Sequence, residues 1–382
     1  MLSYWESTHF TKYDFIIIGS GIVGLSTAIS LADKYPHASI AILERGIFPT
    51  GASTRNAGFA CFGSLTELLS DSKNMPLEKV LNLVTERWKG LQQLRTRLGD
   101  ENIGYEGFGG YEMITEKELP ALKELETVNQ WLFPLFNQQV FEQKDELIAT
   151  FGFNQTKVKS LVFNCLEGQI DTGKMMKSLL QLAQSKGIII FTGCQVVEWK
   201  DRLDKSDEVE IKVFDDARKS IISFYATKLV VCTNAFSTKL LPNLDIKAGR
   251  GQVFITKPIK NLSFKGSFHY DEGYYYFRNV GENRILLGGG RNLDFEGEQT
   301  TVMETTPKII EALKKLLSEV IAPNLVWEIE QEWSGIMAFS NIGEIKEPII
   351  AFDSPNVLVG VRCGGMGVAI GTRIGEKLVE KL

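Results

Sequence analysis

The stretch Gly19-Ser-Gly21-Ile-Val-Gly24 decides the fold class of this 382-residue chain. It follows the apolar run 13–18 and opens a segment with helical spacing, and a second apolar run, 38–43, ends at Glu44. A strand, a glycine-rich turn, a helix and a second strand that ends in an acid are typical of a dinucleotide-binding βαβ unit. We therefore predict that this unit binds an adenine dinucleotide.

Each residue of this motif has a physical role in the prediction. Gly19 permits the tight turn out of the strand, Gly21 leaves room for a pyrophosphate, and Gly24 lets the helix pack closely against the strand. The unpaired N–H groups and the positive dipole end of the helix would hold the phosphates. Glu44 is placed to accept hydrogen bonds from ribose hydroxyls. The predicted cofactor contacts of this unit also include Ser20, Ile22, Val23 and Arg45.

Composition limits the functional classes. Hydrophobic residues make up 44% of the chain and charged residues 23%, which is typical of a globular protein with about two domains. A net charge of −5 with interspersed charges argues against nucleic-acid binding. The apolar runs are too short for a transmembrane segment and the N-terminus lacks a signal-peptide pattern, so we expect a cytoplasmic protein. The five cysteines form no CxxC pair and the three histidines are dispersed, which predicts no metal site.

The order of the expected elements indicates an interrupted domain. The expected helices are 77–98, 116–136, 174–185, 307–320 and 368–382, and the expected strands are 188–191, 195–199, 209–214, 221–226, 228–233, 252–256, 273–278, 284–287 and 356–360. The predicted fold is α/β: a Rossmann-like dinucleotide-binding domain with an inserted substrate domain of antiparallel sheet plus helices. The first domain would comprise 1–98, 165–249 and 325–382, and the second 99–164 and 250–324.

Several segments, in order along the chain, carry a resemblance to a known family. They are the loop Gly51-Ala-Ser-Thr-Arg-Asn-Ala-Gly58, Gly168-Gln-Ile-Asp-Thr172, Leu229-Val-Val-Cys-Thr-Asn-Ala235, Arg250-Gly-Gln252, Trp333-Ser-Gly335 and Gly364-Gly-Met-Gly-Val368. Together they resemble the FAD-dependent D-amino-acid oxidase / glycine oxidase (DAO) superfamily. Within it, Ser3-Tyr-Trp-Glu6 and the 51–58 loop look most like the γ-glutamylputrescine oxidase branch.

The resemblance implies that the cofactor is FAD, held by an FAD-binding domain. In the 51–58 loop, Ser53 and Thr54 would offer hydroxyls, and Arg55 would pair with a phosphate or cover the isoalloxazine edge. Val196 would meet the adenine through its main chain. The segment 364–368, at a helix start, would place positive potential near the flavin N1–C2=O region. The implied cofactor contacts are Ala52, Ser53, Thr54, Arg55, Asn56, Ala57, Gly58, Val196, Thr233, Asn234, Gly364, Gly365, Met366, Gly367 and Val368.

The resemblance also implies a reaction: oxidation of the C–N bond of an amine or amino acid by hydride transfer to flavin N5, followed by imine hydrolysis. Oxygen or another acceptor would take the electrons. Amino-acid oxidases of the group usually carry an arginine two residues after the W-x-G glycine, where this chain has Met337. Either Arg278 supplies the charge for a substrate carboxylate, or the substrate has none. Tyr274 and Tyr276, on one strand face, would wall the substrate pocket with Met337.

Alternatives remain open from the sequence. Tyr274 and Tyr276 could be one packed face of a sheet, and Arg278 an ordinary ion-paired residue. His269 is a candidate for the pocket wall. Lys346 is either near flavin N5, where it would favour reaction with oxygen, or a solvated loop residue. Cys61 and Cys363 neighbour the flavin-facing glycines and could attach a flavin covalently.

Alternative functions are also open. A related enzyme acting on a C–OH bond, such as a 2-hydroxy-acid or glycerol-3-phosphate dehydrogenase, would use the same cofactor. A flavoprotein subunit that passes electrons to a partner protein belongs to a different class. A nicotinamide-dependent dehydrogenase would be colourless when pure, whereas a flavoprotein would be yellow.

Overall fold

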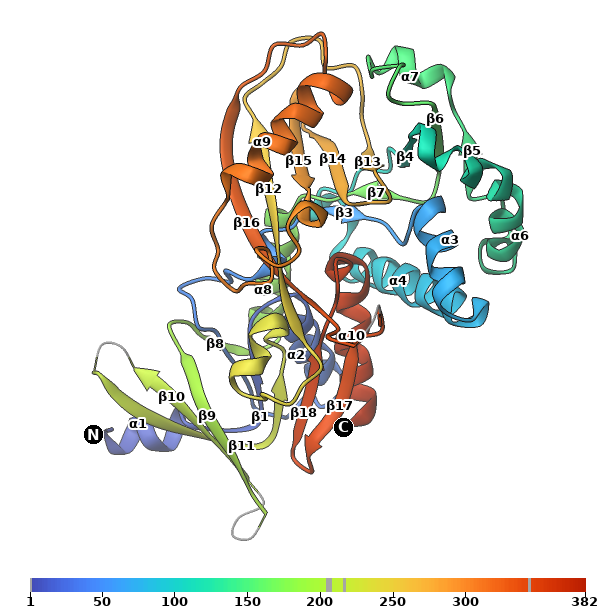
Figure 1. Ribbon diagram of the computed structural model, residues 1–382. Helices are drawn as coiled ribbons and strands as arrows, with labels where there is room; N and C mark the ends of the chain where they lie inside the picture. Colours follow the sequence, from blue (N-terminus) through green and yellow to red (C-terminus); the bar gives the residue numbers. More distant parts are fainter. Residues whose placement is uncertain (1, 204–207, 216–217, 343–344) are drawn as a thin grey trace.

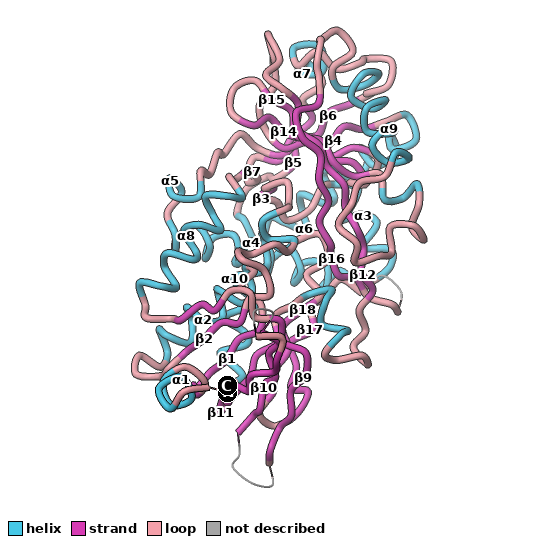
Figure 2. Tube along the Cα trace, turned by 90° about the vertical axis from the view of Figure 1, so that its left-hand side faces the viewer, coloured by secondary structure: helices cyan, strands magenta, loops and turns pink. Residues whose placement is uncertain are grey.

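The computed structural model describes residues 2–203, 208–215, 218–342 and 345–382. Its strands form two eight-stranded sheets and a short two-stranded ladder. The two large sheets occupy opposite ends of the molecule in Figure 1, and the turned view of Figure 2 separates them in the same way.

The first sheet is built around the glycine motif. Its strand order is β17(Ile349–Ser354)-β18(Val357–Val361)-β11(Ser220–Val231)-β1(Lys12–Ile18)-β2(Ile40–Leu43)-β8(Ile189–Phe191), and β9(Gln195–Arg202) and β10(Glu208–Asp215) extend β11 as antiparallel strands. β18, β11, β1, β2 and β8 are parallel. The three predicted chain segments thus meet in one sheet, because its neighbouring strands come from the start, middle and end of the sequence.

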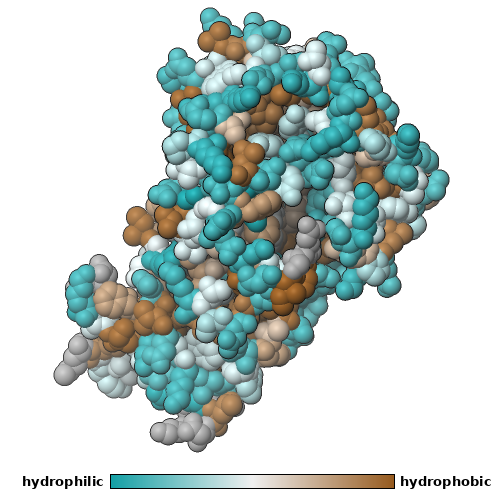
Figure 3. All heavy atoms as spheres, viewed as in Figure 1, coloured by the Kyte–Doolittle hydropathy of each residue, from teal (hydrophilic) through white to brown (hydrophobic). Residues whose placement is uncertain are grey.

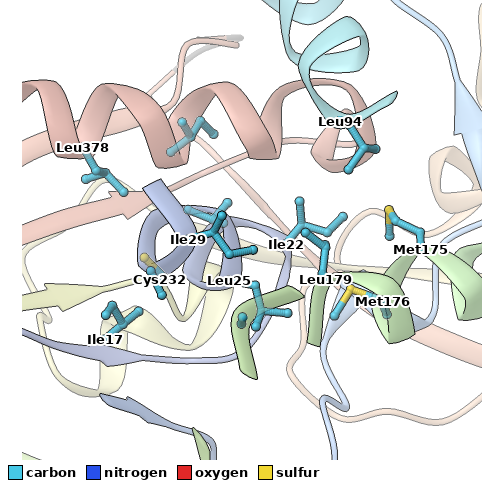
Figure 4. Close-up of a cluster of buried hydrophobic side chains, with 14 of the residues drawn as sticks. Ile17, Ile22, Leu25, Ile29, Leu94, Met175, Met176, Leu179, Cys232 and Leu378 are labelled. Carbon is cyan, nitrogen blue, oxygen red and sulfur yellow. The ribbon is translucent and has the colours of Figure 1, made fainter. Parts of the chain in front are cut away.

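Helices cover one face of this sheet, and β9 and β10 pack with its other face. The covering helices are α2(Ile22–Lys34), α4(Leu77–Leu98), α8(Thr172–Ser185) and α10(Gly367–Lys381). Figure 4 shows their side chains meeting in one cluster, in which Ile17 of β1 lies beneath Leu25, Ile29, Leu179 and Leu378. These buried positions recur at the helical spacing expected from the sequence.

The second sheet has the order β16(Ile329–Phe339)-β12(Lys247–Thr256)-β15(Arg284–Gly289)-β14(Tyr275–Val280)-β13(Ser267–Tyr270)-β4(Gly110–Ile114)-β6(Ser160–Asn164)-β5(Phe141–Gln143). One face packs against α9(Pro307–Leu316) through Phe268, Phe277 and Leu313. The alternate residues, His269 and Tyr276, belong to the opposite face because side chains alternate along a strand. The remaining helices are α1(Tyr4–His9), α3(Leu65–Asn74), α5(Asp100–Ile103), α6(Leu125–Phe136) and α7(Glu146–Thr150), and the two-stranded ladder pairs β3(Phe59–Ala60) with β7(Gly168–Gln169).

Strands β12 and β16 run from the second sheet down to the first in both views (Figures 1 and 2). They pair along their length, from Lys247 opposite Phe339 to Thr256 opposite Ile329. The predicted boundary at residues 324/325 placed 329–339 in the nucleotide-binding domain, whereas β16 pairs in the second sheet. The division into two domains otherwise stays a prediction.

Other local differences have simple causes. The two expected strands 221–226 and 228–233 form one strand, β11, because its first half pairs with β10 and its second half with β1 and β18. The expected helix 307–320 ends as α9 at Leu316 and continues as a π-helical turn, Leu317–Ile321. The region 116–136 is a 3-10 helix, Glu116–Glu124, followed by α6. The turn expected at Asp215-Asp216 lies partly outside the described residues.

Polar residues cover most of the face shown in Figure 3. Within the described ranges, no helix combines the length and apolar character that crossing a membrane requires. The same ranges contain no group of three or more His, Cys, Asp or Glu side chains arranged to hold a metal ion.

Candidate active site

A cavity of about 870 Å³ lies between the two sheets. The carboxyl ends of β1 and β2 border it at Gly19 and Glu44, and the second sheet borders it at His269, Tyr276 and Met337. Ligands of parallel α/β sheets bind at the carboxyl ends of the strands, and pockets of this size are typical of small-molecule sites. The cavity is therefore the candidate active site.

The motif requires glycine at these positions because neighbouring atoms lie too close for a side chain. Gly19 has φ +99°, and a Cβ there would lie 3.0 Å from the carbonyl oxygen of Cys232. A Cβ on Gly24 would lie 1.9 Å from the Gly19 carbonyl oxygen, which is the close helix–strand packing predicted for that residue. A Cβ on Gly21 would lie 2.9 Å from Ser53 Oγ. The turn therefore leaves a backbone surface at the cavity without side chains.

Glu44 lies at the end of β2 and is buried. Its Oε2 accepts hydrogen bonds from the Ser20 backbone N–H at 3.0 Å and the Ser20 hydroxyl at 2.6 Å, and its Oε1 accepts one from the Gly46 N–H at 2.8 Å. These donors hold the carboxylate in place at the cavity wall. Each carboxylate oxygen accepts more than one hydrogen bond in proteins, so a ribose hydroxyl could still be bound.

The 51–58 loop is held in shape by its own polar side chains. Arg55 donates from Nε to the Thr50 carbonyl at 3.1 Å and from Nη1 to the Ser334 carbonyl at 3.0 Å. Trp333 Nε1 donates to the Arg55 carbonyl at 3.0 Å, so the loop is tied to β16 in both directions. Asn56 accepts from the Gly58 N–H at 2.8 Å. The loop is thus fixed against the second sheet.

The final glycine segment closes the cavity on the side of β18. The Asn234 side chain accepts a hydrogen bond from the Arg362 N–H at 3.1 Å, which positions the chain just before this segment. Helix α10 then begins at Gly367, so its N-terminus lies at the cavity wall. A Cβ on Gly365 would lie 4.0 Å from Met337 Sδ, which places Met337 beside the segment.

The structure brings most of the predicted site residues to this one cavity. The residues that line it are Gly19, Gly21, Ile22, Val23, Glu44, Arg45, Ala52, Ser53, Arg55, Asn56, Ala57, Gly58, Val196, Thr233, Asn234, Tyr274, Tyr276, Met337, Gly364, Gly365, Met366, Gly367 and Val368. Ser20, Gly24, Thr54 and Arg278 lie behind the wall. Ser20 and Thr54 act through hydrogen bonds to Glu44 and to the carbonyls of Pro49 and Gly51.

Arg278 is not placed to bind substrate. Its guanidinium donates to the carbonyl oxygens of Ala57 and, at 3.1 Å each, of Ile170 and Asn279. Burial lowers the pKa of Arg278 to about 10, while Glu106 and Asp171 partly offset the effect. Arg278 therefore joins β14 to the 51–58 loop. Its place on the same strand face as Tyr276 made it a candidate, but nearby carbonyls take up its donors.

An aromatic group forms the wall of the second sheet. The ring of Phe59 packs edge-on against His269 at 5.2 Å and against Tyr276 at 5.7 Å between centroids. His269 Nε2 is buried without a hydrogen-bond partner among the described residues. Burial lowers the pKa of His269, with a smaller opposing effect from Glu67, and burial raises the pKa of Tyr276 to about 12. The His269 imidazole in this wall is therefore neutral.

An ion-pair group that the sequence predictions largely missed also borders the cavity. Lys346 Nζ lies 3.1 Å from Glu67 Oε1 and 2.6 Å from Asp71 Oδ1, and Arg87 Nη1 lies 3.2 Å from Glu67 Oε1. Burial favours the protonated acid, but Arg87 and Lys346 outweigh it and lower the pKa of Glu67 to about 2. The available signals were an arginine within the apolar stripe of α4 and two acids four residues apart on α3. Lys346 is thus an ion-paired cavity residue.

Cys61 and Cys363 also border the cavity. Burial raises the pKa of both thiols, to about 12 for Cys363, so neither is a thiolate at neutral pH. Since the thiolate is the reactive form, this environment does not favour covalent attachment.

Arg291, Phe295 and Phe339 are further cavity residues that the sequence predictions missed. The Arg291 guanidinium carbon lies 4.1 Å from the ring centroid of Phe339 and 5.1 Å from that of Phe295. Phe339 continues the Gly335, Met337 spacing of β16, so strand alternation was an available signal for it. Arg291 follows a glycine turn, and no sequence pattern indicated its place in the cavity.

Comparison with known proteins now identifies the family. The family model for DAO, FAD-dependent oxidoreductase, matches residues 14–381. L-2-hydroxyglutarate dehydrogenase of Escherichia coli is 53% identical over 47 residues, a stretch covering 12% of this chain and only 11% of that protein. The probable oxidoreductase OrdL of Haemophilus influenzae is 25% identical over 297 residues, covering 74% of this chain and 65% of the relative.

Solved structures have the same fold. Glycine oxidase from Geobacillus kaustophilus superposes with a TM-score of 0.74 at 18% identity, covering 97% of this chain and 94% of that chain. L-proline dehydrogenase from P. horikoshii gives 0.74 at 16% identity, covering 97% and 93%. The predicted fold class, superfamily and FAD cofactor are confirmed. The chain therefore belongs to the DAO family of FAD-dependent oxidoreductases, and it is an enzyme of that family.

Proposed function

We propose that the protein oxidises the C–N bond of an amino acid or amine, with hydrolysis of the resulting imine. The observation that carries the proposal is the aromatic wall of Phe59, His269 and Tyr276 in the cavity, which favours an uncharged amine over an ammonium group. The names of the similar structures glycine oxidase and L-proline dehydrogenase likewise state an amino acid as the compound that those proteins oxidise.

The residues of the first sheet fit FAD in this proposal. The glycine turn and the start of α2 would hold the pyrophosphate, because backbone N–H groups and the helix dipole favour anions. The Ile22 N–H at this helix start donates to Ser53 Oγ at 3.0 Å, which places Ser53 at the same position. Glu44 would bind the adenosine ribose, and the 51–58 loop with the 364–368 segment would enclose the isoalloxazine. FAD, when bound, supplies the hydride acceptor. The start of α10 places positive potential beside it, which favours added negative charge there.

The second sheet then orients the substrate. An ammonium group loses its proton before hydride transfer, and His269 Nε2 is a neutral acceptor for that proton. Phe59 and Tyr276 surround the amine with aromatic surface, which excludes water and favours the uncharged form. Membership of the γ-glutamylputrescine oxidase branch remains a prediction within this proposal.

A 2-hydroxy-acid dehydrogenase is the second candidate. The short stretch similar to L-2-hydroxyglutarate dehydrogenase favours it, and His269 could equally accept a proton from a hydroxyl group. The two candidates differ in the bond that is oxidised, so substrates that differ only in an amino or hydroxyl group distinguish them.

The test is anaerobic mixing of the purified yellow protein with matched pairs of amino acids and 2-hydroxy acids, together with simple amines and polyamines. Bleaching of the flavin absorbance by the amino compounds is expected. Bleaching by the hydroxy acids alone would contradict the proposal. Admitting air afterwards shows whether oxygen accepts the electrons, and Lys346→Met is expected to slow this step without slowing anaerobic bleaching, if Lys346 assists the reaction with oxygen.

A further inference from the structure

Arg291 is a cation of the cavity wall that the chemistry described above leaves unused. It begins a single 3-10 turn, Arg291–Leu293, directly after β15, and Gly290 makes the turn with φ +75°. The turn brings the guanidinium over Phe339, with Phe295 close to it as well. Stacking occupies the faces of a guanidinium and leaves its N–H edge available for a planar acceptor.

The hydrogen bonds of Arg291 distinguish it from neighbouring arginines. Its Nε is buried and has no partner in the described part of the chain. By contrast, Arg55 and Arg87 donate to backbone carbonyls or carboxylates of the protein. Buried donors nearly always have acceptors in folded proteins, and a carboxylate satisfies a guanidinium with two parallel hydrogen bonds. An anionic ligand would supply the missing acceptor.

Arg291 also lies at a suitable distance from the presumed reaction centre. A Cβ on Gly249 would lie 2.9 Å from Arg291 Nη1, and a Cβ on Gly251 would lie 2.9 Å from Met337 Cε and 3.7 Å from the Tyr276 hydroxyl. Gly249 and Gly251 are two residues apart on one face of β12, which is roughly 7 Å along a strand. A carboxylate bound at Arg291 therefore keeps the adjoining carbon near Met337 and Tyr276, beside the 364–368 segment.

The surroundings of Arg291 indicate what the rest of the ligand is. Tyr274 and Phe295 pack edge-on at 6.1 Å, and these cavity residues remain 40% and 49% exposed. The cavity acids Glu67 and Asp71 are already paired with cations, and Glu272, which lines the cavity with Tyr274, lies 4.0 Å from Lys117 Nζ. A second charged group therefore gains less here than an apolar group that covers the two rings.

We propose that Arg291 binds the substrate carboxylate and that Tyr274 and Phe295 cover a large apolar side chain, so that the substrate is an amino acid with an aromatic or similarly large apolar side chain. The naming of an amino acid rests on the proposed C–N oxidation. The assignment of Arg291 as carboxylate anchor does not, since a 2-hydroxy acid carries the same group.

A binding experiment without turnover tests the anchor. Phenylacetate, which has the carboxylate and the ring but no oxidisable amine, is titrated into the FAD-loaded protein, and the change in flavin absorbance is recorded. Arg291→Met is expected to weaken binding about 100-fold, since hydrogen bonds to charged groups contribute roughly that factor. Arg291→Lys keeps the charge but loses the paired donors. Its phenylacetate affinity is therefore expected to lie between those of the wild type and Arg291→Met. Arg284→Met, at the start of β15 and outside the cavity lining, is the control and is expected to bind like the wild type.

The outcomes separate the parts of the proposal. Equal phenylacetate affinity in wild type and both Arg291 variants would overturn the anchor. Phe295→Ala is expected to weaken phenylacetate about tenfold and leave acetate unchanged. Tighter binding of glutarate than of phenylacetate by the wild type would overturn the apolar side-chain site. If phenylacetate binding depends on Arg291 but only phenyllactate, and not phenylalanine, bleaches the flavin, then the anchor stands and C–N oxidation is wrong.

Discussion

Glu167→Gln is the most informative single change behind the cavity wall. It removes the ionisation of one buried acid and so shows how much that acid contributes to the pH dependence of the protein's stability. Glu167 is 2% exposed, and its Oε1 accepts hydrogen bonds from the Phe62 N–H at 2.9 Å and the Gly63 N–H at 3.2 Å. Burial raises the pKa of Glu167 to about 8, the two N–H groups oppose this, and the nearby acids Glu67 and Glu112 raise the pKa further. The side chain is therefore protonated in the folded protein at neutral pH.

The sign and size of the effect follow from this pKa. In the unfolded chain the acid ionises near its ordinary value of 4.5, so the folded state binds the extra proton between that pH and about 8. The stability due to the protonated acid is fully present below pH 4.5 and is lost as the pH rises towards 8. At 1.36 kcal/mol per unit the loss is at most about 5 kcal/mol. For 382 residues this corresponds to about 6 °C in Tm, from the usual unfolding entropy per residue.

Glutamine has the shape of the protonated acid and cannot ionise, so the variant should not show this loss. The assay compares the Tm of wild type and variant, both saturated with FAD, at about pH 5 and about pH 8.5. The two proteins should be similar at the lower pH, and the variant should be the more stable by about 4–6 °C at the higher pH. Glu282→Gln, at an exposed site, is the control and should show no such change. A constant difference between Glu167→Gln and wild type across this range would refute the reasoning.

Three further changes test the cofactor site and the role of Arg278. Gly24→Ala should lower the flavin-to-protein absorbance ratio, because its Cβ would lie 1.9 Å from the Gly19 carbonyl oxygen, whereas Gly107→Ala, whose nearest neighbour would be 3.5 Å away, should not. Glu44→Ala should weaken FAD binding roughly 10- to 100-fold in equilibrium dialysis, and unchanged retention would remove Glu44 from the ribose site. Arg278→Met should lower the Tm, because the carbonyls of Ala57 and Ile170 lose their donor, without changing the ratio of phenylacetate to phenylethylamine affinity. A selective loss of phenylacetate binding would return Arg278 to the substrate site.

The sequence predicted which residues of the glycine-rich segments line the cavity, because the signals of those segments are local. The turn at Gly19–Gly24 is made by neighbouring residues, and the segment 364–368 begins a helix whose start is visible in the sequence. The substrate half depends on residues distant in the chain. Arg278 is removed from the cavity by carbonyls 221 and 108 positions away in sequence, which no strand periodicity encodes.

Arg291 is a second residue whose position could not be predicted from the sequence. It lies in a short turn without a periodic pattern, and its position over Phe339 depends on the turn at Gly290 and on the pairing of β12 with β16. Glycines at 249 and 251 make the room that the arginine and Met337 fill, but their purpose is visible only when the strands are paired. The departure at Met337 is visible in the sequence, whereas the position of Arg291 in the cavity wall is visible only in three dimensions.

These placements leave a simple charge balance around the cavity. Backbone carbonyls surround Arg278, and the ion-pair group of Glu67, Asp71, Arg87 and Lys346 contains equal numbers of acids and bases. The basic residues Arg45, Lys239 and Lys247 also line the cavity. Two further sources of positive potential are the start of α10 and Arg291. Both favour anions, one beside the presumed flavin and the other beside the presumed substrate carboxylate. An ammonium group gains nothing from the start of α10 and Arg291, so the amine should react in its neutral form.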